Sequence, residues 1–444
     1  MTTSGETLDV GSGQRRKALI GAAIGNFVEW YEYAAYGYLA IYLGKLFFDS
    51  DNEGTQLLSA FAVFGVSFLA RPLGALYFGP LADRIGRKRV MVIVLMMMSV
   101  STVVIGVIPS YASIGLAAPV MLVACRLVQG FSAGGEFGSV NAFLSEYAKK
   151  GHRGLAVSWM PVTSILGMMV GGGFATALSA ALGDNVMLDW AWRVPFLMAG
   201  PLGIVALFIR LKLEDTPEFR RMSELGETST APLRELRDFR RNLLVAAGIA
   251  TLYGVSFYMV FTYLITFLRA EVGLSAGYAL LSVSCGGLVA LVLLPLSGAL
   301  SDKVGRRPVL LVSGLGFLVL SYPLFLLAGG GSLGGAIAGA VCLSALQATF
   351  LTTAFATLSE LFPARVRTTG VSVSANFAVA LFGGMAPFFA TLLISETGNP
   401  ASPALYLVGA AAVGCIALMF MNKDLLVGGS TDLAGEKQLL RSDP

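Results

Sequence analysis

Long uncharged, apolar stretches alternate along the chain with short clusters of charged residues. A helix needs roughly 20 apolar residues to cross about 30 Å of hydrocarbon. The apolar stretches reach this length, whereas a membrane β-strand shows only about ten residues of alternating character. The pattern therefore predicts an all-α polytopic membrane protein. Twelve transmembrane helices are expected, at 18–44, 56–82, 90–109, 117–146, 154–182, 192–210, 242–268, 274–300, 308–328, 334–360, 368–395 and 402–422.

The composition supports a membrane protein and excludes other classes. Of the 444 residues, 55% are apolar and only 13% are charged, which is about half the charged share of an ordinary soluble protein. The net charge of +4 is too small to indicate a nucleic-acid partner. All four cysteines lie in apolar stretches, so they indicate helix packing and not a disulfide framework.

The positions of the basic residues predict how the chain crosses the membrane. If the N-terminus is cytoplasmic, 26 of the 31 Lys and Arg residues fall in cytoplasmic tails and loops, and three fall on the opposite side. The other two, Arg71 and Arg126, lie within spans. Cytoplasmic loops carry this excess of positive charge, so we expect both termini in the cytoplasm. The first 14 residues lack the apolar core of a cleaved signal peptide.

The two halves of the chain repeat one plan. The sequence GPLADRIGRK at 79–88 returns as GALSDKVGRR at 298–307, and Glu146 and Arg153 have counterparts in ELFPARVRTTG at 360–370. Transporters are often built from such repeats, with a binding site between them. We therefore divide the chain into an N-terminal tail (1–17), a six-helix bundle (18–211), a linker (212–241), a second six-helix bundle (242–422) and a C-terminal tail (423–444). The C-terminal tail shows no heptads, so we expect no coiled coil there.

These motifs carry a resemblance to a known superfamily. The doubled G-x-L-x-D-[RK]-x-G-R-[RK] loop, with RLVQG at 126–130, resembles the signature of the major facilitator superfamily. Further motifs resemble its metabolite:proton symporter family, namely GNFVEWYE at 25–32, RPLG at 71–74, GGEFG at 134–138, WRVPF at 192–196 and EDTPEF at 214–219. That family includes bacterial carriers for proline and glycine betaine, 2-oxoglutarate, citrate, dicarboxylates, shikimate and aromatic acids. The segment FYMVFTYL at 257–264 is most similar to the proline/betaine branch.

The resemblance implies the major facilitator fold in a bacterial cytoplasmic membrane and a secondary active transporter that imports a small polar organic solute with protons. We favour a zwitterion such as proline or glycine betaine, because the charges within the spans are of both signs. Proton-coupled uptake of an organic acid is the alternative, followed by a passive facilitator or a transporter-fold sensor. The spans carry no DxxxD, HExxH or P-loop pattern, so we expect no enzyme activity, metal or cofactor. The partners expected are the solute, protons and the lipid bilayer, and we expect a monomer.

Charged residues within the spans are the candidates for proton coupling. A charge at the bilayer centre costs about 2.5–3.5 kcal/mol, so each one needs a partner or a water-filled cavity. The acidic candidates are Glu136, Glu29 and Glu32, of which we favour Glu136 as the proton carrier and Glu29 as a substrate contact. The alternative is that these charges form structural ion pairs, for example Arg126 with Glu29.

Charged, polar and aromatic side chains on spans of both halves are expected to contact the substrate. The expected contacts are Glu29, Tyr33, Tyr36, Arg126, Gln129, Tyr258 and Gln347. For Arg71 and Arg193 we leave open whether the role is functional or structural.

The repeated loops are expected to gate the transporter. An Asp at a helix end can accept hydrogen bonds from the N-terminus of a neighbouring helix and pair with an adjacent Arg, and such a contact must break when the carrier opens. The expected gating residues are Asp83, Arg84, Gly86, Arg87, Glu146 and Arg153 in the first half and Asp302, Gly305, Arg306, Glu360 and Arg367 in the second.

Overall fold

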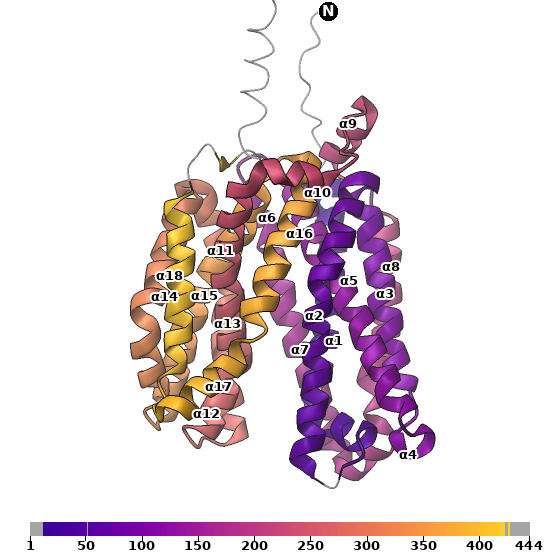
Figure 1. The fold of residues 1–444 in the computed structure, drawn as a ribbon, viewed down its shortest axis with the longest axis vertical. Coiled ribbons are helices and arrows are strands. Elements are labelled where there is room, and N and C mark those ends of the chain that lie inside the picture. The colour runs from indigo at the N-terminus through magenta and orange to yellow at the C-terminus, as the bar shows by residue number, and fades with distance from the viewer. Residues whose placement is uncertain (1–11, 51, 422–424, 427–444) are drawn as a thin grey trace, which may run out of the picture.

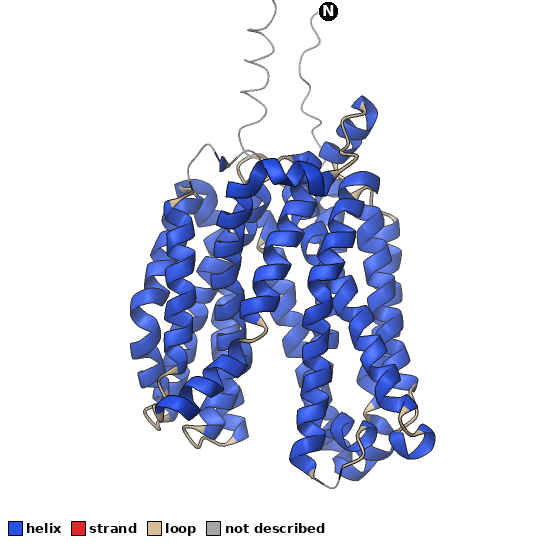
Figure 2. Ribbon diagram, in the orientation of Figure 1, coloured by secondary structure: helices blue, strands red, loops and turns tan. Residues whose placement is uncertain are grey.

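A computed structural model describes residues 12–50, 52–421 and 425–426 of the chain, and these residues form helices and loops without a β-strand (Figure 2). Most of the two expected tails, 1–17 and 423–444, lies outside the described residues. Ten helical segments are long and apolar enough to cross a membrane. The helix at 12–47 and the shorter helix at 403–419 complete the set of twelve. The prediction of an all-α membrane protein with twelve spans is confirmed.

The first six spans are single long helices. They are α1 (Ser12–Phe47), α2 (Glu53–Ile85), α3 (Arg87–Val107), α5 (Ala117–Tyr147), α7 (Trp159–Val186) and α8 (Arg193–Leu211). Short helices join them, namely α4 (Tyr111–Ile114), α6 (Arg153–Val157) and the π-helical turn η1 (Met187–Ala191). Within this half α1 packs on α7, α2 on α5, and α3 on both α5 and α8.

The second six spans include two that are interrupted. The helix α11 (Arg240–Tyr258) passes through a π-helical turn, η3 (Met259–Tyr263), into α12 (Leu264–Ala270). Similarly, α16 (Arg367–Ala378) passes through η5 (Val379–Gly383) into α17 (Ala386–Thr397). The other four are α13 (Ala276–Val304), α14 (Arg306–Ala328), α15 (Leu333–Glu360) and α18 (Pro403–Met419). The sequence pattern predicted the spans but not these π-helical turns, which often mark functional sites.

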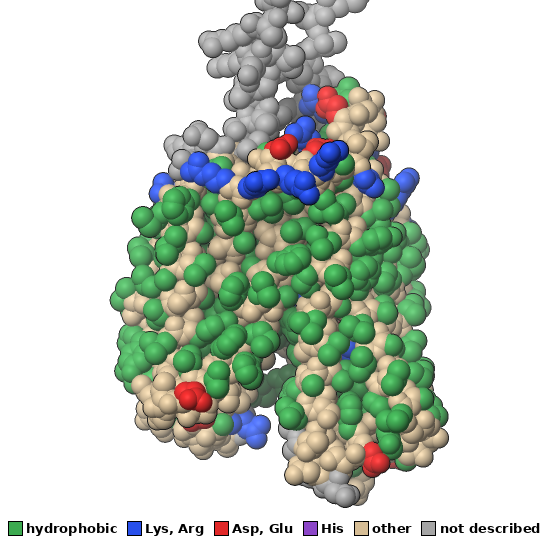
Figure 3. Space-filling model, viewed as in Figure 1, with side chains coloured by type: hydrophobic (Ala, Val, Ile, Leu, Met, Phe, Trp, Pro, Cys, Tyr) green, Lys and Arg blue, Asp and Glu red, His purple; other side chains and the backbone are tan. Residues whose placement is uncertain are grey.

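Short helices cross one end of the molecule between the two halves. These are α9 (Pro217–Leu225), α10 (Pro232–Glu235) and η2 (Leu236–Phe239), and η4 (Ala364–Val366) precedes α16. Lys and Arg side chains gather at this end, and apolar side chains dominate the face between the two ends (Figure 3). We call it the basic end.

The halves are closed against each other at the basic end and parted at the other. Across the boundary, α16 packs on α2 and α5, and α13 packs on α6 and α7. At the opposite end the two groups of helices diverge (Figure 1), and the space-filling view shows a hollow between them (Figure 3). Helices of both halves therefore form the walls of the space between the bundles.

Candidate transport site

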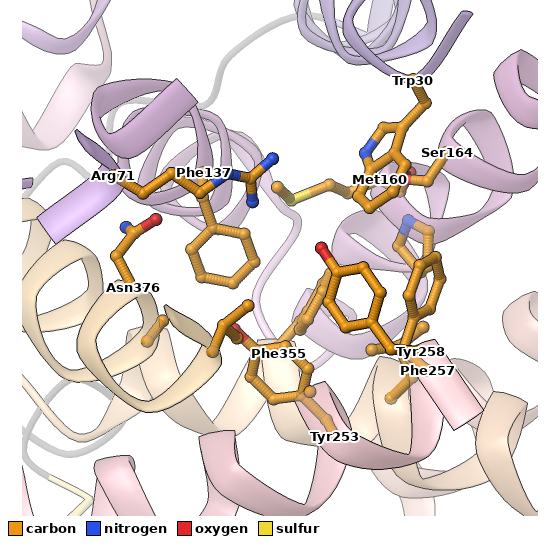
Figure 4. A pocket seen from close by; sticks show the side chains of 15 residues that line it. Trp30, Arg71, Phe137, Met160, Ser164, Tyr253, Phe257, Tyr258, Phe355 and Asn376 are labelled. Atoms are coloured by element: carbon orange, nitrogen blue, oxygen red, sulfur yellow. Dashed lines mark hydrogen bonds between the residues drawn. The ribbon is translucent and has the colours of Figure 1, made fainter. Parts of the chain in front are cut away.

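A cavity lies between the halves, and six of the fifteen residues that line it are aromatic. Its aromatic and polar wall residues are Trp30, Arg71, Phe137, Ser164, Tyr253, Phe257, Tyr258, Phe355 and Asn376 (Figure 4). They come from α1, α2, α5 and α7 of the first half and from α11, α15 and α16 of the second. Any solute in this cavity would contact both halves at once.

Aromatic rings meet across the boundary in this wall. The ring centroids of Trp30 and Phe257 are 5.0 Å apart, and those of Phe137 and Phe355 are 4.9 Å apart. Aromatic faces carry a negative quadrupole and attract cations such as quaternary ammonium groups. The wall is therefore suited to an organic cation or the cationic end of a zwitterion.

Arg71 provides positive charge in the cavity and connects it to an acidic residue. Its Nη2 lies 3.4 Å from Oε1 of Glu29 on α1. Its guanidinium carbon lies 5.0 Å from the ring centroids of both Tyr33 and Phe68. Figure 4 shows the guanidinium reaching into the cavity. The pairing of Arg126 with Glu29, weighed from the sequence, is wrong because Arg71 is the partner of Glu29.

Arg126 lies in a buried cluster next to Arg71, and the Tyr33 ring contacts both guanidinium groups. Its guanidinium carbon is 4.2 Å from the ring centroid of Tyr36 and 4.9 Å from that of Phe64. Its Nη1 donates a 2.7 Å hydrogen bond to Gln129 Oε1. No carboxylate lies within ion-pair distance of Arg126 among the residues that the structure describes. Aromatic faces, the Gln129 amide and the Ser67 hydroxyl thus surround the Arg126 guanidinium.

Glu32 joins the same cluster through Thr102. The Thr102 hydroxyl donates to Glu32 Oε2 at 2.5 Å and accepts from Gln129 Nε2 at 2.6 Å. The other carboxyl oxygen of Glu32 is buried and has no hydrogen-bond partner within the described part of the chain. Glu32 therefore accepts a hydrogen bond from one neutral donor, the Thr102 hydroxyl of α3, which in turn accepts from Gln129 of α5.

Glu136 is paired with Arg210, which the charge pattern had placed in a cytoplasmic loop. Arg210 is buried at the end of α8 and donates through both terminal nitrogens to the Glu136 carboxylate. It also donates to the carbonyl oxygens of Met91 at 2.6 Å and Gly21 at 3.2 Å. This pair ties α5, α8, α3 and α1 together. The count of charges within spans was wrong by this one residue, because a charge at a helix end cannot be distinguished from a loop charge by sequence alone.

Two aspartates at the basic end accept hydrogen bonds across the boundary. Asp83, at the end of α2, accepts from the backbone N–H groups of Thr368 at 3.2 Å and Thr369 at 2.8 Å, at the start of α16. Asp302, at the end of α13, accepts from those of Gly154 at 2.8 Å and Leu155 at 2.9 Å, in α6. We call these the first and second latch.

In each latch a glycine follows the aspartate in sequence, and an arginine forms an ion pair with that aspartate. Gly86 has a φ of 107° and Gly305 a φ of 95°, a conformation that costs other residues energy. Arg87 Nη2 lies 3.3 Å from Asp83 Oδ1, and Arg306 Nη2 lies 2.8 Å from Asp302 Oδ1. The arginine of the second latch also pairs with Glu360 at 2.8 Å. The two loop motifs, which are 219 residues apart in the sequence, thus produce the same geometry twice.

A strap formed by residues 214–219 adds a further contact across the basic end. Glu218 pairs with Arg153 of the first half at 3.2 Å and with Arg367 of the second half at 2.5 Å. Arg367 also pairs with Glu146 at 2.9 Å. Burial raises the pKa of Glu218, but the charges of Arg367 and Arg153 outweigh it and hold the pKa below its ordinary value. Glu218 is therefore ionised at neutral pH and bridges the halves.

The remaining predicted residues lie outside the cavity. Arg84 donates to the carbonyl oxygen of Thr230 in the linker. Arg193 donates to the carbonyl oxygen of Ile108 at 3.0 Å, away from the basic end. Gln347 is buried and donates to the backbone carbonyl of Tyr253 at 3.3 Å. Of the seven residues expected to contact substrate, Tyr258 is the one whose side chain lines the cavity.

Several cavity residues were not predicted as contacts. They include Trp30, Phe137, Ser164, Phe257, Phe355 and Asn376. Because Trp30, Phe137 and Phe257 lie inside the motifs that carry the family resemblance, these motifs were an available signal. Nothing in the sequence distinguishes Phe355 and Asn376 from other residues of apolar spans.

Two helical bundles with a cavity between them form the architecture of a membrane transporter. In this structure the bundles are closed against each other at one end and parted at the other. The family model of the Major Facilitator Superfamily matches residues 22–387. The chain belongs to the major facilitator superfamily, as the repeated loops predicted.

Individual relatives and one solved structure extend this comparison. The proline/betaine transporter of Escherichia coli (strain K12) is 35% identical over 424 residues, covering 93% of this chain and 85% of that protein. The citrate-proton symporter of Klebsiella pneumoniae is 35% identical over 416 residues, covering 93% of each. The solved structure of the proton:xylose symporter XylE bound to 6-bromo-6-deoxy-D-glucose superimposes with a TM-score of 0.77 at 16% identity, covering 93% of this chain and 96% of XylE.

Proposed function

We propose that this transporter imports a small zwitterion, such as proline or glycine betaine, together with protons. The observation that carries the proposal is the position of Arg71 in a wall of aromatic rings. A guanidinium group binds a carboxylate through two parallel hydrogen bonds, and aromatic faces bind the cationic nitrogen of the same molecule. The proline/betaine transporter among the relatives is consistent with this assignment.

The cavity gives less support to an organic acid. Arg71 is the only Lys or Arg among the described residues that line it. A tricarboxylate such as citrate carries up to three negative charges, and each would need a cation or a desolvated donor. Although one relative is a citrate-proton symporter, we propose the zwitterion because one arginine matches one carboxylate.

Proton coupling follows from competition for Arg71. In the empty carrier Arg71 pairs with Glu29. When a substrate carboxylate binds Arg71, it takes the place of Glu29, and a carboxylate left buried without a cation is costly unless it binds a proton. Substrate and proton therefore bind together, and the empty carrier returns with its Arg71–Glu29 pair intact. We assign the proton to Glu29.

The other two acidic candidates receive different roles in this proposal. Both oxygens of Glu136 are bonded to Arg210, so we assign Glu136 to holding helices together. Glu32 contacts Thr102 and does not line the cavity, so we assign it to positioning α1. This assignment replaces the preference for Glu136 that the sequence suggested.

We further propose that the basic end faces the cytoplasm, because cytoplasmic loops carry an excess of Lys and Arg. The cavity would then open outward in this structure, with the two latches and the strap closing the cytoplasmic side. Inward opening breaks the latches, and closure at the other end replaces them. Each chain contains a complete cavity, which supports a working monomer in the cytoplasmic membrane.

Uptake into proteoliposomes tests the proposed function. Labelled proline, glycine betaine and citrate are supplied outside, with an imposed pH gradient that is acidic outside. We expect a zwitterion to accumulate, the accumulation to vanish when a protonophore collapses the gradient, and citrate not to accumulate. Accumulation of citrate alone would overturn the zwitterion assignment, and accumulation insensitive to the protonophore would overturn proton coupling.

A further inference from the structure

We infer that Asn376 selects, among zwitterions, those that carry an N–H group on their cationic nitrogen. The inference rests on the proposed function, because it concerns how the same cavity distinguishes one zwitterion from another. It starts from the carboxamide of Asn376, which belongs to α16 of the second half and lines the cavity.

The orientation of this carboxamide is fixed by two hydrogen bonds. Nδ2 of Asn376 donates to the carbonyl oxygen of Ser372, one turn earlier on α16, at 2.9 Å. It also donates to the carbonyl oxygen of Gly134 on α5, across the boundary, at 3.1 Å. Carbonyl oxygens can only accept. Turning the carboxamide over would place Oδ1 against two acceptors, so the nitrogen must face them.

The carboxamide oxygen is left facing the cavity. Asn376 is 3% exposed, and its Oδ1 accepts no hydrogen bond from any residue that the structure describes. Some side-chain oxygens, for example Gln347 Oε1, are fully buried and have no hydrogen-bond partner. Oδ1 of Asn376 is not one of these fully buried atoms. In Figure 4 this oxygen lies on the side of Arg71, toward the cavity. A bound solute can therefore reach it.

Oδ1 of Asn376 differs from the other polar groups in the wall. Arg71 and Trp30 can only donate hydrogen bonds. The Ser164 hydroxyl is occupied, since it donates to the carbonyl oxygen of Met160 at 3.0 Å and accepts from Asn26 Nδ2 at 2.9 Å. The hydroxyl groups of Tyr253 and Tyr258 can donate or accept. Oδ1 can only accept, so it complements a donor on the substrate.

This oxygen separates two kinds of cationic nitrogen that the aromatic wall treats alike. A secondary ammonium group, as in proline, has N–H donors that can bond to Oδ1 while Arg71 holds the carboxylate. A quaternary ammonium group has no donor, and its methyl groups would cover Oδ1 and remove it from water without replacing the hydrogen bond. An unpaired buried acceptor costs binding free energy. Asn376 thus favours N–H zwitterions over quaternary ones.

Competition between two matched solutes tests the inference. Counterflow of labelled proline is measured in proteoliposomes with unlabelled proline or N,N-dimethylproline as competitor, because these two differ only in N–H against N–CH₃. The variants are Asn376→Leu, which removes the acceptor, and the control Ser313→Ala, which removes a buried hydroxyl outside the cavity. Asn376→Ala, which also removes the acceptor, is measured as well, so that the test remains possible if Asn376→Leu does not fold.

We expect Asn376→Leu and Asn376→Ala to lower the preference for proline over N,N-dimethylproline by about tenfold or more, since a hydrogen bond from a charged donor is lost. Ser313→Ala should leave the preference unchanged. If Asn376 serves only to bond Gly134, its replacement would weaken the binding of both competitors equally. The preference for proline over N,N-dimethylproline would then equal that of the unaltered protein, and this result would overturn the inference. If neither solute competes in the unaltered protein, the proposed function itself fails.

Discussion

Nη2 of Arg71 lies 3.4 Å from Oε1 of Glu29, and Arg71 lines the cavity whereas Glu29 does not. A substrate that binds Arg71 therefore changes the surroundings of Glu29 without contacting it. In this arrangement the substrate carboxylate and the Glu29 carboxylate compete for one guanidinium group, so substrate binding favours protonation of Glu29. Coupling then needs no separate relay of titratable side chains.

Replacing Arg71 with lysine should weaken transport although the charge is kept. A lysine ammonium is a point charge and cannot form the two parallel hydrogen bonds that a guanidinium makes to a carboxylate. We expect the KM for the zwitterion to rise about tenfold or more, which initial-rate uptake measurements would show. Arg193→Lys is the matched control, because Arg193 donates to backbone carbonyls outside the cavity. Equal KM values in both variants would remove Arg71 from the substrate site.

Glu136→Gln should destabilise the protein. The change leaves Arg210 charged and buried without a carboxylate, and breaking a buried pair in this way costs about 3–5 kcal/mol. We expect a lower apparent Tm in detergent and less protein in the membrane. The double variant Glu136→Leu/Arg210→Met should recover much of the loss, because it removes both charges together. A Glu136→Gln protein that is as stable as the unaltered one but does not accumulate solute would instead restore Glu136 as the proton carrier.

Asp302→Asn should shift the transporter toward a state that is open at the basic end. The second latch loses a charged acceptor for two backbone N–H groups and the partner of Arg306, so the closed state is weakened. Spin labels at the exposed positions Arg89 and Lys303, in a background without the four native cysteines, should report a longer distance.

The matched control for the latch is Asp238→Asn, because Asp238 is an exposed aspartate of the linker. Its distance distribution should equal that of the unaltered protein. If Asp302→Asn gives that same distribution, the latch does not hold the closed state.

The latches were the most predictable part of the site. A repeated Asp after a helix and before Gly-Arg implies a fixed geometry, since the side chain reaches only the nearest helix N-terminus and the glycine is required for the turn. The sequence could not say that this N-terminus belongs to the other half. That relation depends on how the halves pack, which involves contacts such as Thr369 with Asp83, 286 residues apart.

The cavity was less predictable because its chemistry is aromatic. Phe137, Phe257 and Phe355 look like any phenylalanine that faces lipid or packs in a core, and span periodicity does not show which face meets the other half. Arg210 was wrongly placed in a loop, because its position at a helix end does not show that it is buried against Glu136. Charge counting finds charges inside spans only when they lie far from the ends.

The central claim is that solute and proton enter together because the solute carboxylate displaces Glu29 from Arg71. Its most direct test is proton movement into proteoliposomes, followed with an internal pH-sensitive dye when a zwitterion is added outside without an imposed gradient. We predict that the unaltered protein acidifies the interior as solute enters. Glu29→Gln should exchange labelled solute across the membrane without moving protons, and Glu271→Gln, at an exposed glutamate outside the cavity, should behave as the unaltered protein. Solute-dependent acidification that persists in Glu29→Gln would contradict the account.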